Sequence, residues 1–217
     1  MNFPEMIRLL MEATGAVAFA CSGSLLAIRK KMDLLGICIM GVVTAVGGGM
    51  LTDIILGIHP PALFRNPGMT ALAALTSVVV FLIAKSHVNH PEHTKTEHLG
   101  KTAMLIADTI GLAAFTVAGV SKARVNGYDS LFLLVFLGTL TGTGGGLIRD
   151  LLAQEPPYIF TKHIYASAAI LGSLVCALLY DVIGEVPASA AGCAVVIIIR
   201  ALASHFRWNL PRVSDEA

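Results

Sequence analysis

Five ionisable residues lie inside or close to long apolar segments of this chain. They are Glu12, Asp53, Asp108, Arg149 and Asp150. An ionisable side chain at membrane depth is costly, and such residues normally face a cavity, an ion pathway or a partner of opposite charge. They indicate a protein that binds a charged species within an apolar barrier or lets it pass through.

A run of three glycines precedes two of these acids. The last glycine of each run lies four residues before Asp53 or Asp150. Glycine is about 1 kcal/mol worse than alanine inside a helix, so three in succession weaken an apolar helix. The pattern predicts two broken helices, one in each half of the chain. The glycines concerned are Gly47, Gly48, Gly49, Gly144, Gly145 and Gly146.

A break at either triplet would lie at membrane depth. The apolar residues before the triplets, 34–46 and 131–143, would span roughly 20 Å of a hydrocarbon core ~30 Å thick. Freed backbone carbonyls are tolerated there only against protein or water, and the C-terminal end of a half-helix favours a cation. Thr44, Thr141 and Thr143 add hydroxyl oxygens. Such oxygen ligands predict a permeant K⁺ or Na⁺ with no bound metal or cofactor.

The glycines have a second interpretation, in which they let two helices pack closely as in the small-xxx-small contacts of membrane proteins. The duplication of the triplet, with an acid one turn later in each copy, favours the broken-helix interpretation. Both can hold together, because a broken helix can also pack closely.

Arg149 distinguishes the two halves, because Thr52 takes its place in the first half. A bare arginine would repel cations, so an acidic partner is expected, and Asp53 and Asp108 are the candidates. Asp150 is adjacent in sequence and is expected to face another direction on the helix. Two roles remain open for Arg149, a structural ion pair and a direct influence on the pathway.

The composition is that of an integral membrane protein. Of the 217 residues, 55% are hydrophobic and 13% are charged, and the mean hydropathy is +0.77. The net charge of +1 gives no reason to expect a nucleic acid as partner. The expected partner is the lipid bilayer. Apolar runs near the span length of ~20 residues predict an all-α fold with seven transmembrane helices. Their expected ranges are 5–28, 34–56, 66–85, 101–123, 130–153, 161–181 and 186–205.

The two halves of the chain align with each other. Glu12 matches Asp108 at an offset of 96, and the glycine triplets with their acids match at 97. Two proline pairs, at 60–61 and 156–157, match again at 96. The alignment predicts an internal duplication. It divides the chain into a first three-helix repeat (1–85), a polar linker (86–100), a second repeat (101–181), and a seventh helix with a short tail (182–217).

Three spans in each repeat place the second repeat upside down relative to the first. Inverted repeats of this kind are typical of transporters and channels. The seventh helix lies outside the repeat, and a cover or an oligomer contact is its expected role. Lysine and arginine gather in the loop at 29–33 and the loops on its side, which predicts an N-terminus outside and a cytoplasmic C-terminus.

Motifs of other protein classes are missing from the sequence. It contains no HExxH, GxSxG or Walker sequence, so an enzyme is not expected. The four cysteines lie in apolar segments without CxxC spacing and are interpreted as small buried hydrophobes. The histidines of 87–93, with His98, could bind a metal, but a solvated linker is the preferred interpretation.

The segments GGGMLTDIILGIHPPALF and GGGLIRDLLAQEPPYIF resemble the paired motifs of the prokaryotic TRIC (trimeric intracellular cation) channels, a family also labelled a glycine transporter domain family. The resemblance covers about residues 5–205. It implies seven spans, two inverted repeats and a homotrimer with one K⁺- and Na⁺-permeable pore in each protomer. It also implies that the kinks of the second and fifth helices fall on the glycine triplets. The implied location is a prokaryotic inner membrane, because the chain lacks the Lys-Glu pair and the long basic tail of the animal members.

The sequence therefore leaves two possible functions. The first is a passive channel for K⁺ and Na⁺, with a pore lined by the two glycine-bearing helices. The second is a secondary transporter of a small zwitterion such as glycine, since half-helix termini could hold its carboxylate and its ammonium group. The acids and the resemblance favour the channel.

Overall fold

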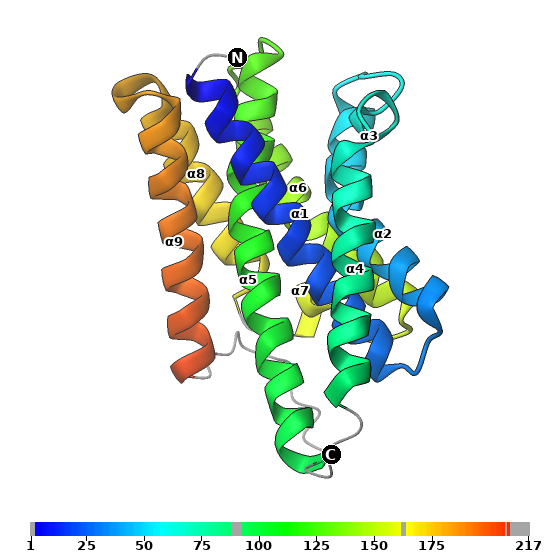
Figure 1. The fold of residues 1–217 in the computed structure, drawn as a ribbon. Coiled ribbons are helices and arrows are strands. Elements are labelled where there is room, and N and C mark those ends of the chain that lie inside the picture. Colours follow the sequence, from blue (N-terminus) through cyan, green and yellow to red (C-terminus); the bar gives the residue numbers. More distant parts are fainter. Residues whose placement is uncertain (1–2, 88–92, 162–163, 207, 209–217) are drawn as a thin grey trace, which may run out of the picture.

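Long apolar helices form the described part of the chain, which is residues 3–87, 93–161, 164–206 and 208 of a computed structural model. Seven of the helices there are long and apolar enough to cross a bilayer, which confirms the predicted all-α membrane fold (Figure 1). In chain order the helices are α1 (Phe3–Arg29), α2 (Leu34–Ile55), α3 (Ala62–Arg65), α4 (Gly68–His87), α5 (His93–Val125), α6 (Leu131–Leu152), α7 (Tyr158–Thr161), α8 (Ala166–Ile183) and α9 (Glu185–Phe206).

Two short helices that were not predicted follow the proline pairs. These are α3 and α7, of four residues each. Proline is well suited to the start of a helix, since its φ is preset and its missing N–H would have had no partner there. A second difference concerns α5, which begins at His93 inside the predicted linker. The candidate metal ligands at 87–93 and His98 lie outside the residues whose side chains the structure describes.

Helices of the two halves correspond in length as well as in order. Both ends of α6 lie 97 residues after those of α2 (131 − 34 and 152 − 55), and both ends of α7 lie 96 after those of α3 (158 − 62 and 161 − 65). Along the bundle α1 and α5 run in opposite directions (Figure 1). The matching boundaries and the opposed directions support the predicted inversion.

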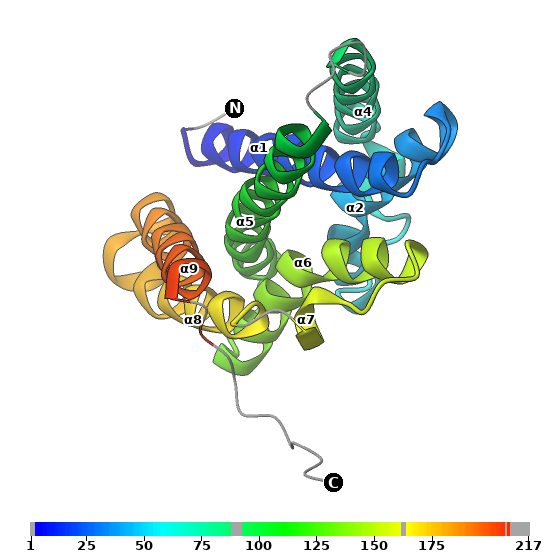
Figure 2. The same cartoon turned by 90° about the horizontal axis from the view of Figure 1, so that it is seen from below.

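Helix α5 lies in the middle of the bundle. Viewed along the helices, α8 and α9 lie to one side of it and α2 and α4 to the other (Figure 2). The seventh span, α9, packs against α8 where Gly192 meets Gly172, because a Cβ on Gly192 would lie 2.8 Å from the carbonyl oxygen of Gly172. The helix outside the repeat is thus held against the second repeat.

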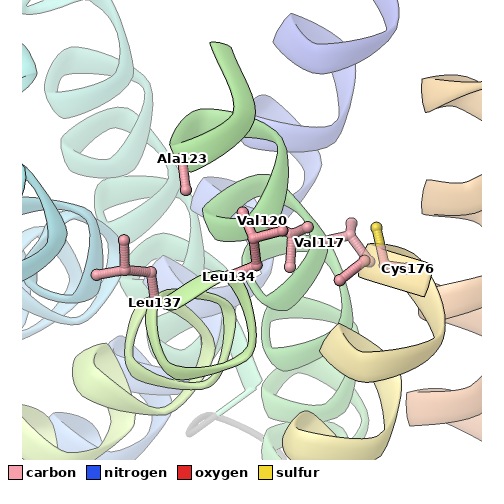
Figure 3. Close-up of a cluster of buried hydrophobic side chains, with 7 residues drawn as sticks. Val117, Val120, Ala123, Leu134, Leu137 and Cys176 are labelled. Carbon is pink, nitrogen blue, oxygen red and sulfur yellow. The ribbon is translucent and has the colours of Figure 1, made fainter. Parts of the chain in front are cut away.

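An apolar core fills the space between α5, α6 and α8. Val117, Val120 and Ala123 of α5 face Leu134 and Leu137 of α6, and all of these side chains are buried (Figure 3). This cluster is completed from α8 by Cys176 and Ala177. It fixes the second repeat as one packed unit and so positions the polar residues of α5 and α6.

Candidate ion pathway

The glycine triplets lie where α2 and α6 cross. A Cβ on Gly48 would overlap the carbonyl oxygen of Thr141, and a Cβ on Gly145 would overlap that of Thr44. Both helices run through their triplets without interruption. The prediction of broken helices is therefore wrong for this conformation, and the close-packing interpretation is the one that the geometry supports.

Energetics explain why the helices stay intact. Three glycines weaken a helix by about 3 kcal/mol in total. Unwinding a turn in an apolar medium would leave several backbone groups unpaired, at several kcal/mol each. The close approach of the two helices also adds dispersion contacts. An intact helix with a glycine contact face is thus lower in free energy than an unwound one.

The other glycines of the triplets differ in what surrounds them. A Cβ on Gly144 would lie 3.1 Å from the Cα of Gly48, and one on Gly146 would lie 2.7 Å from the hydroxyl of Tyr165. A Cβ on Gly47 would lie 2.8 Å from Ile148, whereas a Cβ on Gly49 would have no atom within 4 Å beyond its own stretch of helix. Gly49 therefore borders open space rather than the helix contact.

Contacts at this crossing are reciprocal between the two halves. Gly48 abuts the backbone of α6 as Gly145 abuts that of α2. The rings of Phe19 and Phe115, which match at an offset of 96, lie with centroids 5.3 Å apart. Reciprocity of this kind is what a two-fold axis produces. It supports a pseudo-two-fold axis that passes between these pairs.

The threonine hydroxyls next to the triplets bond to their own helices. Thr44 and Thr141 each donate to the carbonyl four residues earlier at 2.6 Å, and Thr143 does so at 2.7 Å. Thr141 also lies 2.6 Å from the hydroxyl of Thr52, which links α6 to α2. Of the three predicted hydroxyls, only that of Thr141 belongs to a residue that lines a cavity of about 220 Å³ next to Asp53.

Asp53 and Asp150 hold the two short helices in place. The carboxylate of Asp53 accepts a hydrogen bond from the backbone N–H of Ala62, and that of Asp150 from the N–H of Tyr158, both at 2.8 Å. These N–H groups belong to the first residues of α3 and α7, where a helix has unpaired donors and favours a negative charge. The matched acids therefore have a structural role in both halves.

A vestibule opens beside Asp53. This cavity of about 220 Å³ is lined by Glu12, Asp53, Lys122, Phe115 and Gly49, among others. A second cavity, of about 450 Å³, shares Glu12 and Lys122 with the first. We call the two cavities together the vestibule. It lies at the end of the bundle where α1 begins and α2 ends.

The two carboxylates of the vestibule, on Asp53 and Glu12, differ in whether they have an ion-pair partner. The Lys122 ammonium group forms an ion pair with the carboxylate of Asp53. The side chain of Glu12 lines both cavities, is partly exposed, and forms no hydrogen bond or ion pair with the described residues. Lys122 was not among the residues predicted for the site, so its position on the cavity wall was missed.

The corresponding region of the second half is filled by a buried ion cluster. Arg149 is 0% exposed, and its Nη1 lies 2.6 Å from Oδ1 of Asp108. That nitrogen also donates to the hydroxyl of Ser22. Asp108 is thus the acidic partner that was expected, whereas Asp53 is not, because it pairs with Lys122.

Asp150 also contacts Arg149, contrary to expectation. Both Nε and Nη2 of Arg149 lie 2.8 Å from Oδ1 of Asp150. The sequence argument considered the directions of the two Cβ atoms alone. The long arginine side chain folds back toward its neighbour, so adjacent residues meet at their ends.

Aromatic rings enclose the same cluster. The guanidinium carbon of Arg149 lies 5.3 Å from the ring centroid of Tyr158, and the hydroxyl of Tyr165 donates to Asp108 at 3.5 Å. Burial raises the pKa of both phenols, that of Tyr165 well above its usual value. Both rings therefore remain neutral near neutral pH and add no charge to the cluster.

Comparisons with known proteins agree with this architecture. The profile of the family described as Glycine transporter matches residues 9–85 and again residues 105–181. The two matches start 96 residues apart (105 − 9), which is the offset of the internal alignment. One family unit therefore occurs twice in this chain.

Relatives and solved structures match over nearly the whole chain. The UPF0126 inner membrane protein YadS of Escherichia coli (strain K12) is 36% identical over 209 residues, which are 95% of this chain and 96% of YadS. The crystal structure of a prokaryotic TRIC channel in 0.5 M KCl has a TM-score of 0.85 at 31% identity and covers 95% of this chain and 100% of its own. The TRIC trimeric intracellular cation channel orthologue from Rhodobacter sphaeroides has a TM-score of 0.82 at 30% identity, over 93% and 99%. The chain therefore belongs to the prokaryotic TRIC channel family, the family described as Glycine transporter.

Proposed function

We propose that this protein is a passive channel for monovalent cations, with a pore inside the protomer. The observation that carries the proposal is the vestibule, whose wall holds the unpaired carboxylate of Glu12. A carboxylate in a cavity with low-dielectric walls concentrates cations there. The Rhodobacter sphaeroides relative described above is named a cation channel, which adds support.

The pathway would run from the vestibule past the crossing of α2 and α6 to the buried ion cluster. Thr141 marks the inner end of the vestibule, and its hydrogen bond to Thr52 closes the space between the helices. Arg149 is 0% exposed in the opposite half. The described conformation is thus a closed one, and conduction requires the cluster around Arg149 to open.

Selectivity for K⁺ and Na⁺ follows from the ligand chemistry of this route. The polar side chains of its 220 Å³ cavity carry carboxylate, hydroxyl, amide and ammonium groups, and no cluster of metal ligands occurs among the described residues. Oxygen donors suit hard monovalent cations better than transition metals. The glycines of the triplets contribute by bringing the helices together, and Gly49 contributes by leaving space at the wall.

The protein is proposed to act as a homotrimer in a prokaryotic inner membrane, with its N-terminus outside and its C-terminus in the cytoplasm. The name of the Rhodobacter sphaeroides relative includes the word trimeric, and the Escherichia coli relative is named an inner membrane protein. The distribution of lysine and arginine supports the orientation. A cross-linking ladder in mild detergent tests the trimer.

A zwitterion transporter is the second candidate, because the vestibule holds charges of both signs. Glu12 could receive an ammonium group and Lys122 a carboxylate. Purified protein in liposomes separates the two functions. A channel releases K⁺ down its gradient and takes up no radiolabelled glycine. Saturable, ion-coupled glycine uptake without K⁺ release would overturn the channel.

Lys122→Gln is expected to increase K⁺ conductance. The substitution removes a positive charge from the vestibule and frees the Asp53 carboxylate that it pairs with. We expect a rise of roughly two- to tenfold at ~0.01 M KCl that shrinks toward none at ~1 M, because the Debye length falls from about 30 Å to about 3 Å.

Lys30→Gln is the matched control for this substitution. Lys30 lies at the other end of α1 and pairs with Glu155 at 3.1 Å in an exposed position. Its replacement should leave the single-channel conductance near that of the unaltered protein at both salt concentrations. A Lys122 variant with unchanged or lower conductance at low salt would remove this lysine from the pathway.

A further inference from the structure

A second buried arginine reaches the ion cluster from α9, the helix outside the repeat. Arg200 is 5% exposed although it lies inside a membrane-spanning helix. Its guanidinium carbon lies 4.9 Å from the ring centroid of Tyr165. A cation at this depth requires a partner, and Tyr165 supplies only the face of its ring.

The available partner is the second oxygen of Asp108. Nη2 of Arg200 lies 3.8 Å from Oδ2 of Asp108, whereas Oδ1 of the same carboxylate binds Arg149 at 2.6 Å. Asp108 is thus shared between two arginines, one on each oxygen. The separation of 3.8 Å is longer than a hydrogen bond but within the range of an ion pair.

Asp108 and Arg200 both have unpaired polar atoms in the gap between their side chains. Oδ2 of Asp108 and both Nε and Nη2 of Arg200 are buried and have no hydrogen bond in the structure. Leaving such groups unpaired is costly, most of all when they are charged. Their burial is tolerable because each charge faces the opposite one across the gap.

We infer that Arg200 is a positioning residue that neutralises the ion cluster and holds Asp108 away from the permeant cation. With Arg200 the cluster has two positive charges, on Arg149 and Arg200, and two negative charges, on Asp108 and Asp150. Without it the cluster has a net charge of −1, and Asp108 presents a free oxygen. The seventh helix therefore controls the charge of the pathway in addition to covering it.

The charge balance can be tested independently of conduction, by a double-mutant cycle on thermal unfolding in detergent. Arg200→Gln leaves the cluster at −1, Asp108→Asn leaves it at +1, and the double variant restores zero. Each single variant should lower Tm by on the order of 10 °C, and the double variant should lie closer to the unaltered protein than either single one. Losses that simply add in the double variant would overturn the inference.

The conductance part of the inference rests on the proposed channel function. Arg200→Gln should raise the K⁺ single-channel conductance or the open probability at least twofold. Arg200→Lys, which keeps the charge, should restore behaviour near that of the unaltered protein. Arg124→Gln is the control, since Arg124 pairs with Asp129 and Asp181 away from the cluster.

The possible failures remain distinguishable. If the unaltered protein carries no K⁺ current, the channel proposal fails, while the unfolding cycle still decides the charge balance. If it conducts and folded Arg200→Gln conducts equally, Arg200 has no part in the pathway and the inference is wrong. If Arg200→Gln does not fold, rescue of folding by the added Asp108→Asn substitution supports the inference, and failure of that rescue overturns it.

Discussion

Gly48→Ala should separate α2 from α6 and destabilise the protein by about 3 kcal/mol. The added methyl group would overlap the carbonyl oxygen of Thr141, which is backbone and cannot rotate away. Overpacking of an interior site costs typically about 1–3 kcal/mol, and a backbone clash lies at the upper end. Gly145→Ala should behave alike, because its Cβ would overlap the carbonyl of Thr44.

Gly49→Ala is the internal control for this prediction. It introduces the same methyl group one residue away, where no atom beyond its own stretch of helix lies within 4 Å, and alanine is the better helix former. Thermal unfolding in detergent should show a lower Tm for Gly48→Ala and an unchanged or higher Tm for Gly49→Ala. Equal Tm values for the two variants would show that the crossing is not as close as described.

Conduction should change with the same substitutions. Separation of α2 and α6 would weaken the hydrogen bond between Thr52 and Thr141 that closes the inner end of the vestibule. A bulkier Gly48→Leu or Gly145→Leu variant should therefore alter the single-channel conductance while the oligomer still forms. Unchanged conductance in both would restrict these glycines to packing.

Arg149→Gln is expected to cost about 3–5 kcal/mol, because it leaves buried carboxylates without their main counter-charge. Asp108 and Asp150 both bind this guanidinium and are almost fully buried, so neither can turn to water. The corresponding fall in Tm is on the order of 10 °C for a chain of this size. Thermal unfolding of the purified protein measures it.

An arginine whose acidic partners are exposed supplies the comparison for Arg149. Arg124 forms two ion pairs, at 2.7 Å with Asp129 and at 2.8 Å with Asp181, and both acids are largely exposed. Exposed ion pairs contribute about 0–1 kcal/mol, so Arg124→Gln should change Tm little. Equal losses in the two variants would contradict the view that the Arg149 cluster is dry and tightly paired.

The sequence was sufficient to predict the spans and the internal repeat, and it named Asp108 as one of two candidate acidic partners of Arg149. Span prediction works because an apolar medium forces every backbone group into a helix, so hydropathy and length decide the boundaries. The repeat was readable because its glycines, acids and prolines recur at nearly constant offsets.

The state of the glycine triplets could not be predicted from propensity alone. A local penalty of about 3 kcal/mol suggested a break, but the penalty is offset by contacts with a helix nearly 100 residues away. A single sequence does not reveal that Gly48 will face the backbone at Thr141. Tertiary contact thus decided the conformation.

Long side chains account for the other differences. Lys122 and Arg200 were not predicted as site residues, and their long side chains reach the vestibule and the buried ion cluster. Asp150 was expected to face away from Arg149, but the long side chain of Arg149 reaches its carboxylate. A signal for Arg200 did exist, since an arginine within a span requires a polar partner.

The central claim, that the protein conducts monovalent cations through the protomer, is tested most directly by its reversal potential. Purified protein is recorded in a planar bilayer under a tenfold KCl gradient. Discrete openings that reverse near the K⁺ equilibrium potential, about 59 mV from zero at 25 °C, are predicted for a cation-selective pore. Reversal at zero or at the Cl⁻ potential, or the absence of discrete openings, would contradict the account.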